Sequence, residues 1–102
     1  MTQIHTIYTK EQPTENSEIF STLFQNDSIK IESIKSWLKT PGEFYNQDHD
    51  EWVLLLSGEA RLEIENNSFN LKAGDYCFIS RNTLHRVLST SKGALWIGIF
   101  SS

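Results

Sequence analysis

The sequence predicts an all-β domain, a sandwich or barrel of short antiparallel strands. Apolar and polar residues alternate with a period of two from Ile29 to Phe100, which is the pattern of strands with one buried face. Turn residues divide this region at short intervals, and no helical pattern of any length interrupts it. The chain has 102 residues, of which 38% are hydrophobic, so it can form one domain with a single core.

Residues 1–28 are expected to form an N-terminal extension that packs on a barrel of residues 29–102. Residues 1–17 are polar, and a short edge strand is expected at "IHTIY", residues 4–8. The following segment, "SEIFSTLFQND", places four apolar residues at helical spacing, which predicts one or two helical turns that cover the core. Those residues are Ile19, Phe20, Leu23 and Phe24.

The barrel strands are expected at residues 29–38, 51–58, 59–65, 69–80, 85–90 and 94–100, with the fourth segment divided by a turn at "KAGD". The first strand shifts its alternation near Glu32 and Ser33, which is typical of a β-bulge. Pro41 and Gly42 mark the turn after that strand. "NNS" at residues 66–68 predicts a tight hairpin, because asparagine tolerates positive φ.

The strand at residues 51–58 is apolar on both of its faces. If Glu51 points into the barrel, alternation sends Val53 and Leu55 inward with it. The outward residues are just as apolar: Trp52, Leu54 and Leu56. Such a strand needs cover on both faces, either from the N-terminal segment or from the same strand of a second subunit. A homodimer is therefore expected.

The segment "YNQDHDEWVLLLSG", residues 45–58, carries polar residues at a recognisable spacing. Gly42 precedes the segment, and six residues separate Glu51 from Gly58. This pattern resembles the first motif of the cupin superfamily, in particular of small single-domain cupins with a "YxQDxDEW" start. In that motif two histidines occupy the positions that Tyr45 and Gln47 hold here.

A second stretch keeps the spacing of the other cupin motif. Gly74 and His85 match that motif, and its proline, glycine and asparagine positions are held by Ser80, Asn82 and Ser89. Asparagine is a reasonable substitute for glycine in a turn. The resemblance covers about residues 29–100 and implies the cupin fold, an antiparallel double-stranded β-helix or jelly-roll barrel.

The resemblance also implies a metal site. In metal-binding cupins, both histidines of the first motif, its glutamate and the histidine of the second motif converge on one divalent ion inside the barrel. Here the implied ligands are Gln47, Glu51 and His85, for zinc, iron, manganese or nickel without preference. Tyr45 could add a phenolate only if the metal lowered its pKa far below about 10, and His49 could swing in from the loop. Alternatively no metal binds, and Glu51 and His85 pair through a buried hydrogen bond.

Three functions remain open at this point. The first is a metal-dependent enzyme that acts on a small polar metabolite, and the second is a metal-free barrel that binds or senses a small molecule. The third is a dimeric scaffold without catalysis. The fold by itself does not choose between them, because one fold hosts many chemistries. No catalytic residue and no organic cofactor is assigned.

Composition argues against several other classes of protein. The net charge of -4 comes without a basic patch, so no nucleic-acid partner is expected. The longest apolar stretch, "WVLLL", is too short to span a bilayer, and the N-terminus lacks the pattern of a signal peptide. Cys77 is the only cysteine; it is expected in the core rather than as a nucleophile. A single cysteine favours a reducing, cytoplasmic location.

Overall fold

The computed structural model describes residues 2–102, and in this part of the chain every regular element is a β-strand. The strands are β1 (Ser17–Gln25), β2 (Ile29–Trp37), β3 (Glu51–Ser57), β4 (Glu59–Ile64), β5 (Asn67–Lys72), β6 (Tyr76–Ile79), β7 (His85–Thr90) and β8 (Ala94–Ser101). All strand pairs are antiparallel. The predicted antiparallel all-β fold is therefore confirmed.

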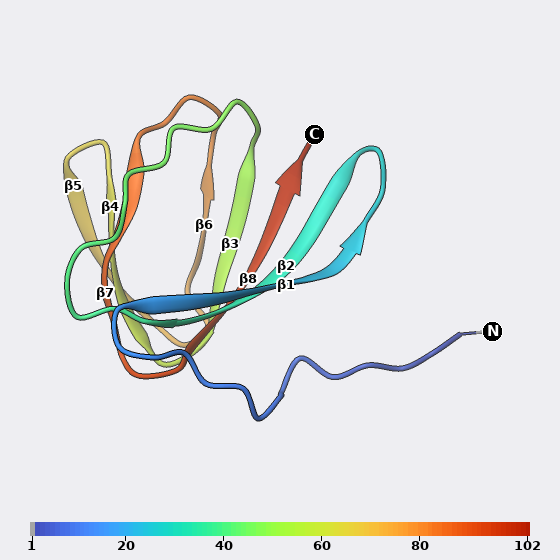
Figure 1. The fold of residues 1–102 in the computed structure, drawn as a ribbon. Helices are drawn as coiled ribbons and strands as arrows, with labels where there is room; N and C mark the ends of the chain where they lie inside the picture. Colours follow the sequence, from blue (N-terminus) through green and yellow to red (C-terminus); the bar gives the residue numbers. More distant parts are fainter. Residues whose placement is uncertain (1) are drawn as a thin grey trace.

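The strands form two sheets that face each other across the core (Figure 1). The larger sheet has the order β1-β2-β8-β3-β6, and the smaller one has the order β5-β4-β7. Apolar side chains from both sheets meet between them: Ile34, Val53, Leu55, Ala60, Leu62, Ile79, Ala94 and Trp96. This shared core positions the first residues of β3 and β7, which carry the candidate site.

The helical turns expected near residues 17–25 are wrong, because this segment is strand β1. Its residues pair with β2 from Ser17 opposite Trp37 to Gln25 opposite Lys30. An isolated helix of this length is marginal in water, whereas an edge strand gains a ladder of hydrogen bonds from its neighbour. The expected cover of the core is also wrong, since the side chains of Phe20 and Phe24 are about half exposed.

The irregularity predicted near Glu32 lies on the partner strand. The pairing of β1 with β2 shifts between Thr22 and Phe24, so the extra residue is in β1. The ladder between β2 and β8 runs from Ile29 to Ser36 without a shift. A bulge in β1 bends this edge strand.

The N-terminal segment runs beside the larger sheet and ends away from the strands (Figure 1). The edge strand expected at residues 4–8 is wrong, because no strand forms there. Lys35 on β2 holds the segment instead: its Nζ donates hydrogen bonds to the backbone oxygens of Thr9 and Glu11, each at 2.8 Å. The division of the chain at residue 28 stays a prediction, and β1 is continuous with the larger sheet.

Two turns have the backbone conformation that their residues predict. Asn82 has a φ of 62°, so asparagine does adopt the left-handed conformation that glycine would provide. The hairpin between β4 and β5 turns on Glu65 and Asn66, with φ of 48° and 69°, one residue earlier than the expected "NNS". Both φ values are positive, as the favoured two-residue hairpin turn requires.

Alternate residues of β3 lie on a buried inner face and a partly exposed outer face, as the alternation predicts. Glu51, Val53 and Leu55 are buried on the inner face. Trp52 on the outer face is partly exposed and packs against Tyr76 at a ring-centroid distance of 5.4 Å. The inward orientation of Glu51 is therefore confirmed, while the second subunit on the outer face stays a prediction. In the described residues, no helix is long and apolar enough to cross a membrane.

Candidate functional site

A cavity of about 480 Å³ opens between the two sheets. This volume falls in the range of small-molecule sites. Four residues at alternate positions of the segment before and into β3 line it: Tyr45, Gln47, His49 and Glu51. His85, at the start of β7, lines the same cavity from the smaller sheet.

Glu51 and His85 meet across this cavity. Glu51 is the first residue of β3 in the larger sheet, and His85 is the first residue of β7 in the smaller sheet. The Glu51 Oε1 atom lies 3.3 Å from His85 Nε2, and both residues are more than nine-tenths buried. The distance suits an ion pair, yet Glu51 Oε1 forms no hydrogen bond with any residue in the described part of the chain. The carboxylate therefore approaches the imidazole without the alignment of a hydrogen bond.

The orientation of the His85 ring is set by its other nitrogen. Nδ1 lies 2.8 Å from the backbone oxygen of Thr83, a carbonyl that can only accept, so Nδ1 carries a proton. In the neutral ring Nε2 then has a lone pair that faces the carboxylate of Glu51. Two acceptors at this distance repel each other unless a cation or a proton lies between them. A proton or another cation between the two atoms would remove this repulsion.

The backbone fixes His85 beside Tyr45. The two residues form an isolated antiparallel bridge, with Tyr45 N donating to His85 O at 2.8 Å and His85 N donating to Tyr45 O at 3.0 Å. Their rings lie 6.0 Å apart between centroids. This bridge attaches the loop before β3 to the start of β7, so the motif residues of both segments face one cavity.

Ionisation at the site follows from burial and charge. Burial lowers the pKa of His85, but the Glu51 carboxylate and the Thr83 carbonyl oppose this, and the net pKa is raised above its ordinary value of 6.5. The pKa of Tyr45 is raised by burial and then by the carboxylates of Glu18, Glu43 and Glu51. The phenol of Tyr45 is therefore neutral near pH 7 in the metal-free protein.

The structure places His49 in the cavity wall, which the motif spacing did not indicate. Its ring contacts Phe100 edge-on, with centroids 5.6 Å apart, and its Nδ1 lies 3.6 Å from Asp48 Oδ1. The signal in the sequence is the alternation itself, because His49 has the same parity as Gln47 and Glu51. His49 is thus a cavity residue in addition to the three predicted ones.

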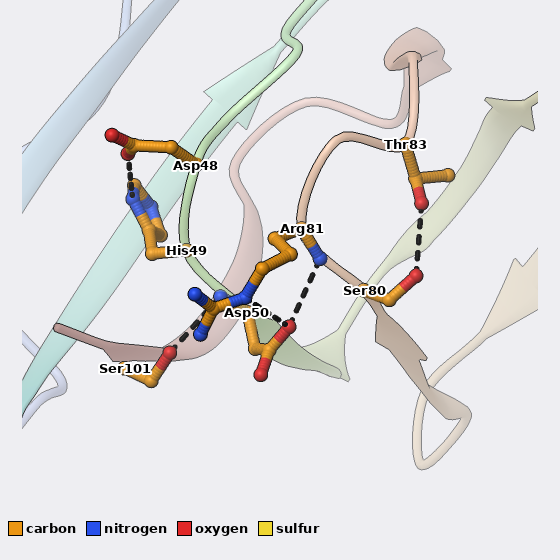
Figure 2. Close-up of polar contacts among 7 residues, drawn as sticks. All are labelled: Asp48, His49, Asp50, Ser80, Arg81, Thr83 and Ser101. Carbon is orange, nitrogen blue, oxygen red and sulfur yellow. Dashed lines mark hydrogen bonds and ion pairs between the residues drawn. The ribbon is translucent and has the colours of Figure 1, made fainter.

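A set of polar contacts holds the loop that carries these residues (Figure 2). Asp50 Oδ1 accepts a hydrogen bond of 2.9 Å from Arg81 N, and Asp50 N donates to Ser101 Oγ at 3.0 Å. Asn82 N donates to Gln47 O at 2.6 Å. The backbone N–H and the side chain of Arg81 hold the pKa of Asp50 below its ordinary value. The loop is therefore anchored to the turn before β7 and to the end of β8.

The donor set can be tested against a divalent ion. Two ligands about 2.1 Å from one ion are separated by about 3 to 3.4 Å in octahedral or tetrahedral geometry, and Glu51 Oε1 and His85 Nε2 are 3.3 Å apart. The contact of Nδ1 with Thr83 O is the second-sphere bond that metal-bound histidines make. Within residues 2–102, no group of three or more His, Cys, Asp or Glu side chains is arranged to hold a metal. Of the predicted ligands, Gln47 is the remaining side chain that lines the cavity beside this pair.

Residues 39–100 match the family model described as the cupin domain. An uncharacterized protein of Aquifex aeolicus (strain VF5) is 30% identical over 77 residues, which are 74% of this chain. The chain spans 64% of the length of that curated relative. The resemblance found in the two motifs is therefore confirmed.

Solved structures agree on the fold. A proposed mannose-6-phosphate isomerase of Ralstonia eutropha JMP134 superposes with a TM-score of 0.85 at 24% identity, over 99% of each chain. KdgF of Halomonas sp. superposes with a TM-score of 0.78 at 18% identity, over 89% of this chain and 86% of its own. DMSP lyase DddQ of Ruegeria pomeroyi DSS-3 gives a TM-score of 0.75 at 16% identity, over 83% of this chain and 47% of its own. At these identities the likeness shows the fold alone.

Proposed function

Because this chain belongs to the cupin domain family, we propose that it binds a small molecule in the cavity between its sheets, beside one divalent metal ion. The ion would be held by Glu51, His85 and Gln47. Catalysis on a small polar metabolite is part of this proposal, as the names of similar structures include an isomerase and a lyase. The choice among zinc, iron, manganese and nickel stays open, because a mixed oxygen and nitrogen donor set suits them all.

One observation carries the proposal. Glu51 Oε1 and His85 Nε2 face each other at 3.3 Å in a buried position, and the imidazole proton is committed to Thr83 O. A buried acceptor without a donor costs about 1 to 3 kcal/mol. A cation between the two atoms would remove this cost, and the distance leaves room for one.

Each residue of the site would have its own role in binding the ion or the ligand. Glu51 supplies the formal negative charge, and His85 supplies a nitrogen ligand whose direction is set by Thr83. Gln47 lines the same cavity and would offer a neutral amide oxygen. A bound ion would act as a Lewis acid on an oxygen of the ligand. Tyr45, with its neutral phenol, would donate a hydrogen bond to that ligand.

A metal-free binding or sensing barrel is the second candidate. The raised pKa of His85 favours it, since an imidazolium can satisfy Glu51 without a metal. In this version a proton occupies the position between the two residues, and the cavity recognises its ligand by hydrogen bonds and apolar contact alone. A dimeric scaffold without a ligand would leave the cavity without a role. The cytoplasmic location stays a prediction.

Metal content distinguishes the two candidates. The protein is purified without chelators and without an affinity metal, its metal is measured by mass spectrometry, and each divalent ion is titrated by calorimetry. The metal version predicts one equivalent per chain, with affinity reduced by about tenfold or more in Glu51→Gln and in His85→Ala. Glu59→Gln, at an exposed position on β4, is the matched control and should bind as the unmodified protein does. Equal metal binding by all four proteins would refute the assignment of ligands.

A further inference from the structure

The charged groups around the cavity are unbalanced. Three side-chain carboxylates line it, from Glu18, Glu32 and Glu51, against a single side-chain amine from Lys30. Lys30 Nζ is paired with Glu32 Oε1 at 2.8 Å, so this amine neutralises a carboxylate of its own strand. In the described part of the chain, no arginine lines the cavity. Glu18 and Glu51 therefore have only histidines as cationic partners within it.

Glu18 is held in place as a cavity residue. It lies on edge strand β1 opposite Ser36 of β2, and Ser36 Oγ, which is fully buried, donates to Glu18 Oε2 at 2.5 Å. This bond uses one oxygen and leaves the other free to accept. Glu18 and Glu51 both place negative charge near Tyr45, another lining residue, whose pKa is raised by burial and then by nearby carboxylates that include these two.

Two residues that line the cavity each carry a buried polar atom that has no hydrogen-bond partner among residues 2–102. One is Glu51 Oε1, an acceptor that points across the cavity toward the smaller sheet, and the other is Trp96 Nε1, a donor on a residue only 2% exposed. Buried polar groups in folded proteins are rarely left unpaired without a functional reason. A ligand with a positive centre and one neutral oxygen would satisfy both atoms.

Aromatic side chains also line the cavity. Phe20 stands at the exposed side of the cavity, Trp96 at its buried side, and Phe100 beside His49. Aromatic faces attract organic cations, by about 0.5 to 2 kcal/mol for each well-placed ring. Carboxylates combined with aromatic rings and without arginine form a site that favours positive charge and disfavours phosphate, since phosphate binding sites use arginine, lysine or helix N-termini.

We propose that the cavity binds a compact organic cation, a protonated amine or an alkylammonium group carrying a hydroxyl or carbonyl oxygen, and rejects phosphorylated metabolites. This inference rests on the proposed function, because it takes the cavity as the binding site. It differs from that function in naming the charge of the ligand. Glu18 is the residue that sets the preference, and it does so whether or not a metal occupies Glu51 and His85.

Two probes of matched size and one larger anionic probe test the charge preference by calorimetry on protein treated with EDTA. Choline carries the cation, 3,3-dimethylbutan-1-ol has the same shape without the charge, and mannose 6-phosphate is an anion. Choline should bind about tenfold more tightly than the neutral alcohol, which corresponds to about 1.4 kcal/mol, and mannose 6-phosphate should not bind. Choline affinity should fall as salt is added, because ions screen the carboxylates.

Variants of single carboxylates test which residue causes the preference for choline over the neutral alcohol. Glu18→Gln can still accept the hydrogen bond of Ser36 and should lose most of the preference for choline over the alcohol. Glu32→Gln, which frees Lys30, is a second variant with the same expected direction. Glu15→Gln removes a carboxylate that pairs with Lys39 outside the cavity and should change nothing. Thermal unfolding of each variant checks that it is folded.

Each of the following outcomes would contradict the inference, and the last would also contradict the proposed function. Equal binding of choline and the alcohol, or an unchanged preference in folded Glu18→Gln and Glu32→Gln, overturns the inference. Binding of mannose 6-phosphate that strengthens in Glu18→Gln also overturns it, but leaves the cavity as a small-molecule site. If no probe binds while one equivalent of metal does, the inference fails and the proposed metal site stands. If neither a probe nor a metal binds, both fail.

Discussion

Glu51 and His85, 34 positions apart in the chain, face each other from opposite sheets with Oε1 and Nε2 separated by 3.3 Å. Each is the first residue of its strand, and both line the cavity between the sheets. The backbone of His85 is bonded to Tyr45, and its Nδ1 contacts Thr83 O. The orientation of the imidazole toward the carboxylate is therefore fixed from both sides, by the backbone bridge and by the Thr83 carbonyl.

The protonation of His85 should depend on Glu51. In metal-free protein the pKa of His85 is expected above 6.5, because the carboxylate and the Thr83 carbonyl favour the imidazolium more than burial disfavours it. Glu51→Gln should lower it. Proton-detected titration of the imidazole by NMR measures this. An unchanged pKa in the variant would show that the two side chains do not interact.

The same shift makes stability depend on pH. A folded-state pKa above the unfolded value stabilises the protein fully below about pH 6.5, and this contribution is lost as the pH rises through the folded pKa. The difference in unfolding free energy between the metal-free protein and Glu51→Gln should therefore be larger at pH 6 than at pH 8. Urea unfolding at both values measures it. A difference that grows with pH would contradict the prediction.

Removal of the carboxylate should destabilise the metal-free fold. Glu51→Ala leaves the buried His85 without its partner and is expected to cost about 1 to 3 kcal/mol. Urea unfolding in the presence of EDTA gives the value. Glu59→Ala, at an exposed position of β4, should change stability by less than about 0.5 kcal/mol. If both variants lose the same amount, the pair contributes nothing specific.

The anchor of the site loop should weaken in acid. The pKa of Asp50 is lowered by Arg81, first through its backbone N–H. Its contribution is present above the ordinary carboxyl pKa and is lost as the pH falls through the folded value. Asp50→Ala should therefore lower the protection factor of the Arg81 amide at pH 7, and the protection factor in the unmodified protein should fall to that level only in acid. Slow exchange at Arg81 in the variant would show that Asp50 does not hold the loop.

The outer face of the larger sheet is expected to bind a second copy of the chain. Trp52 and Leu54 lie on this face next to Tyr76 and Phe78, whose side chains are 66% and 61% exposed. An apolar patch of this kind favours association. Leu54→Lys should convert a dimer to a monomer in sedimentation velocity, while Ser68→Lys, on exposed β5, should not. A monomer in the unmodified protein would rule out the homodimer.

Alternation and motif spacing were enough to predict most strands, the inward face of β3 and the presence of Gln47, Glu51 and His85 in one cavity, while their role as metal ligands stays a prediction. These features are local, because a period of two sends every second side chain to the same face. The same rule, applied one step further, would have placed His49 in the cavity wall. The left-handed turn at Asn82 also follows from a local preference, since asparagine tolerates positive φ.

Other features were decided only by contacts between distant segments. The apolar residues of β1 satisfy helical and strand spacing alike, and pairing with β2 resolves this ambiguity in favour of the strand. The bulge lies in β1, although the sequence pointed to Glu32 on the neighbouring strand. The approach of Glu51 to His85 and the inclusion of Glu18 in the cavity require two sheets to face each other and an edge strand to join one of them. Spacing along the chain specifies the face on which a side chain lies, but the distance between two such faces arises only when the whole core packs.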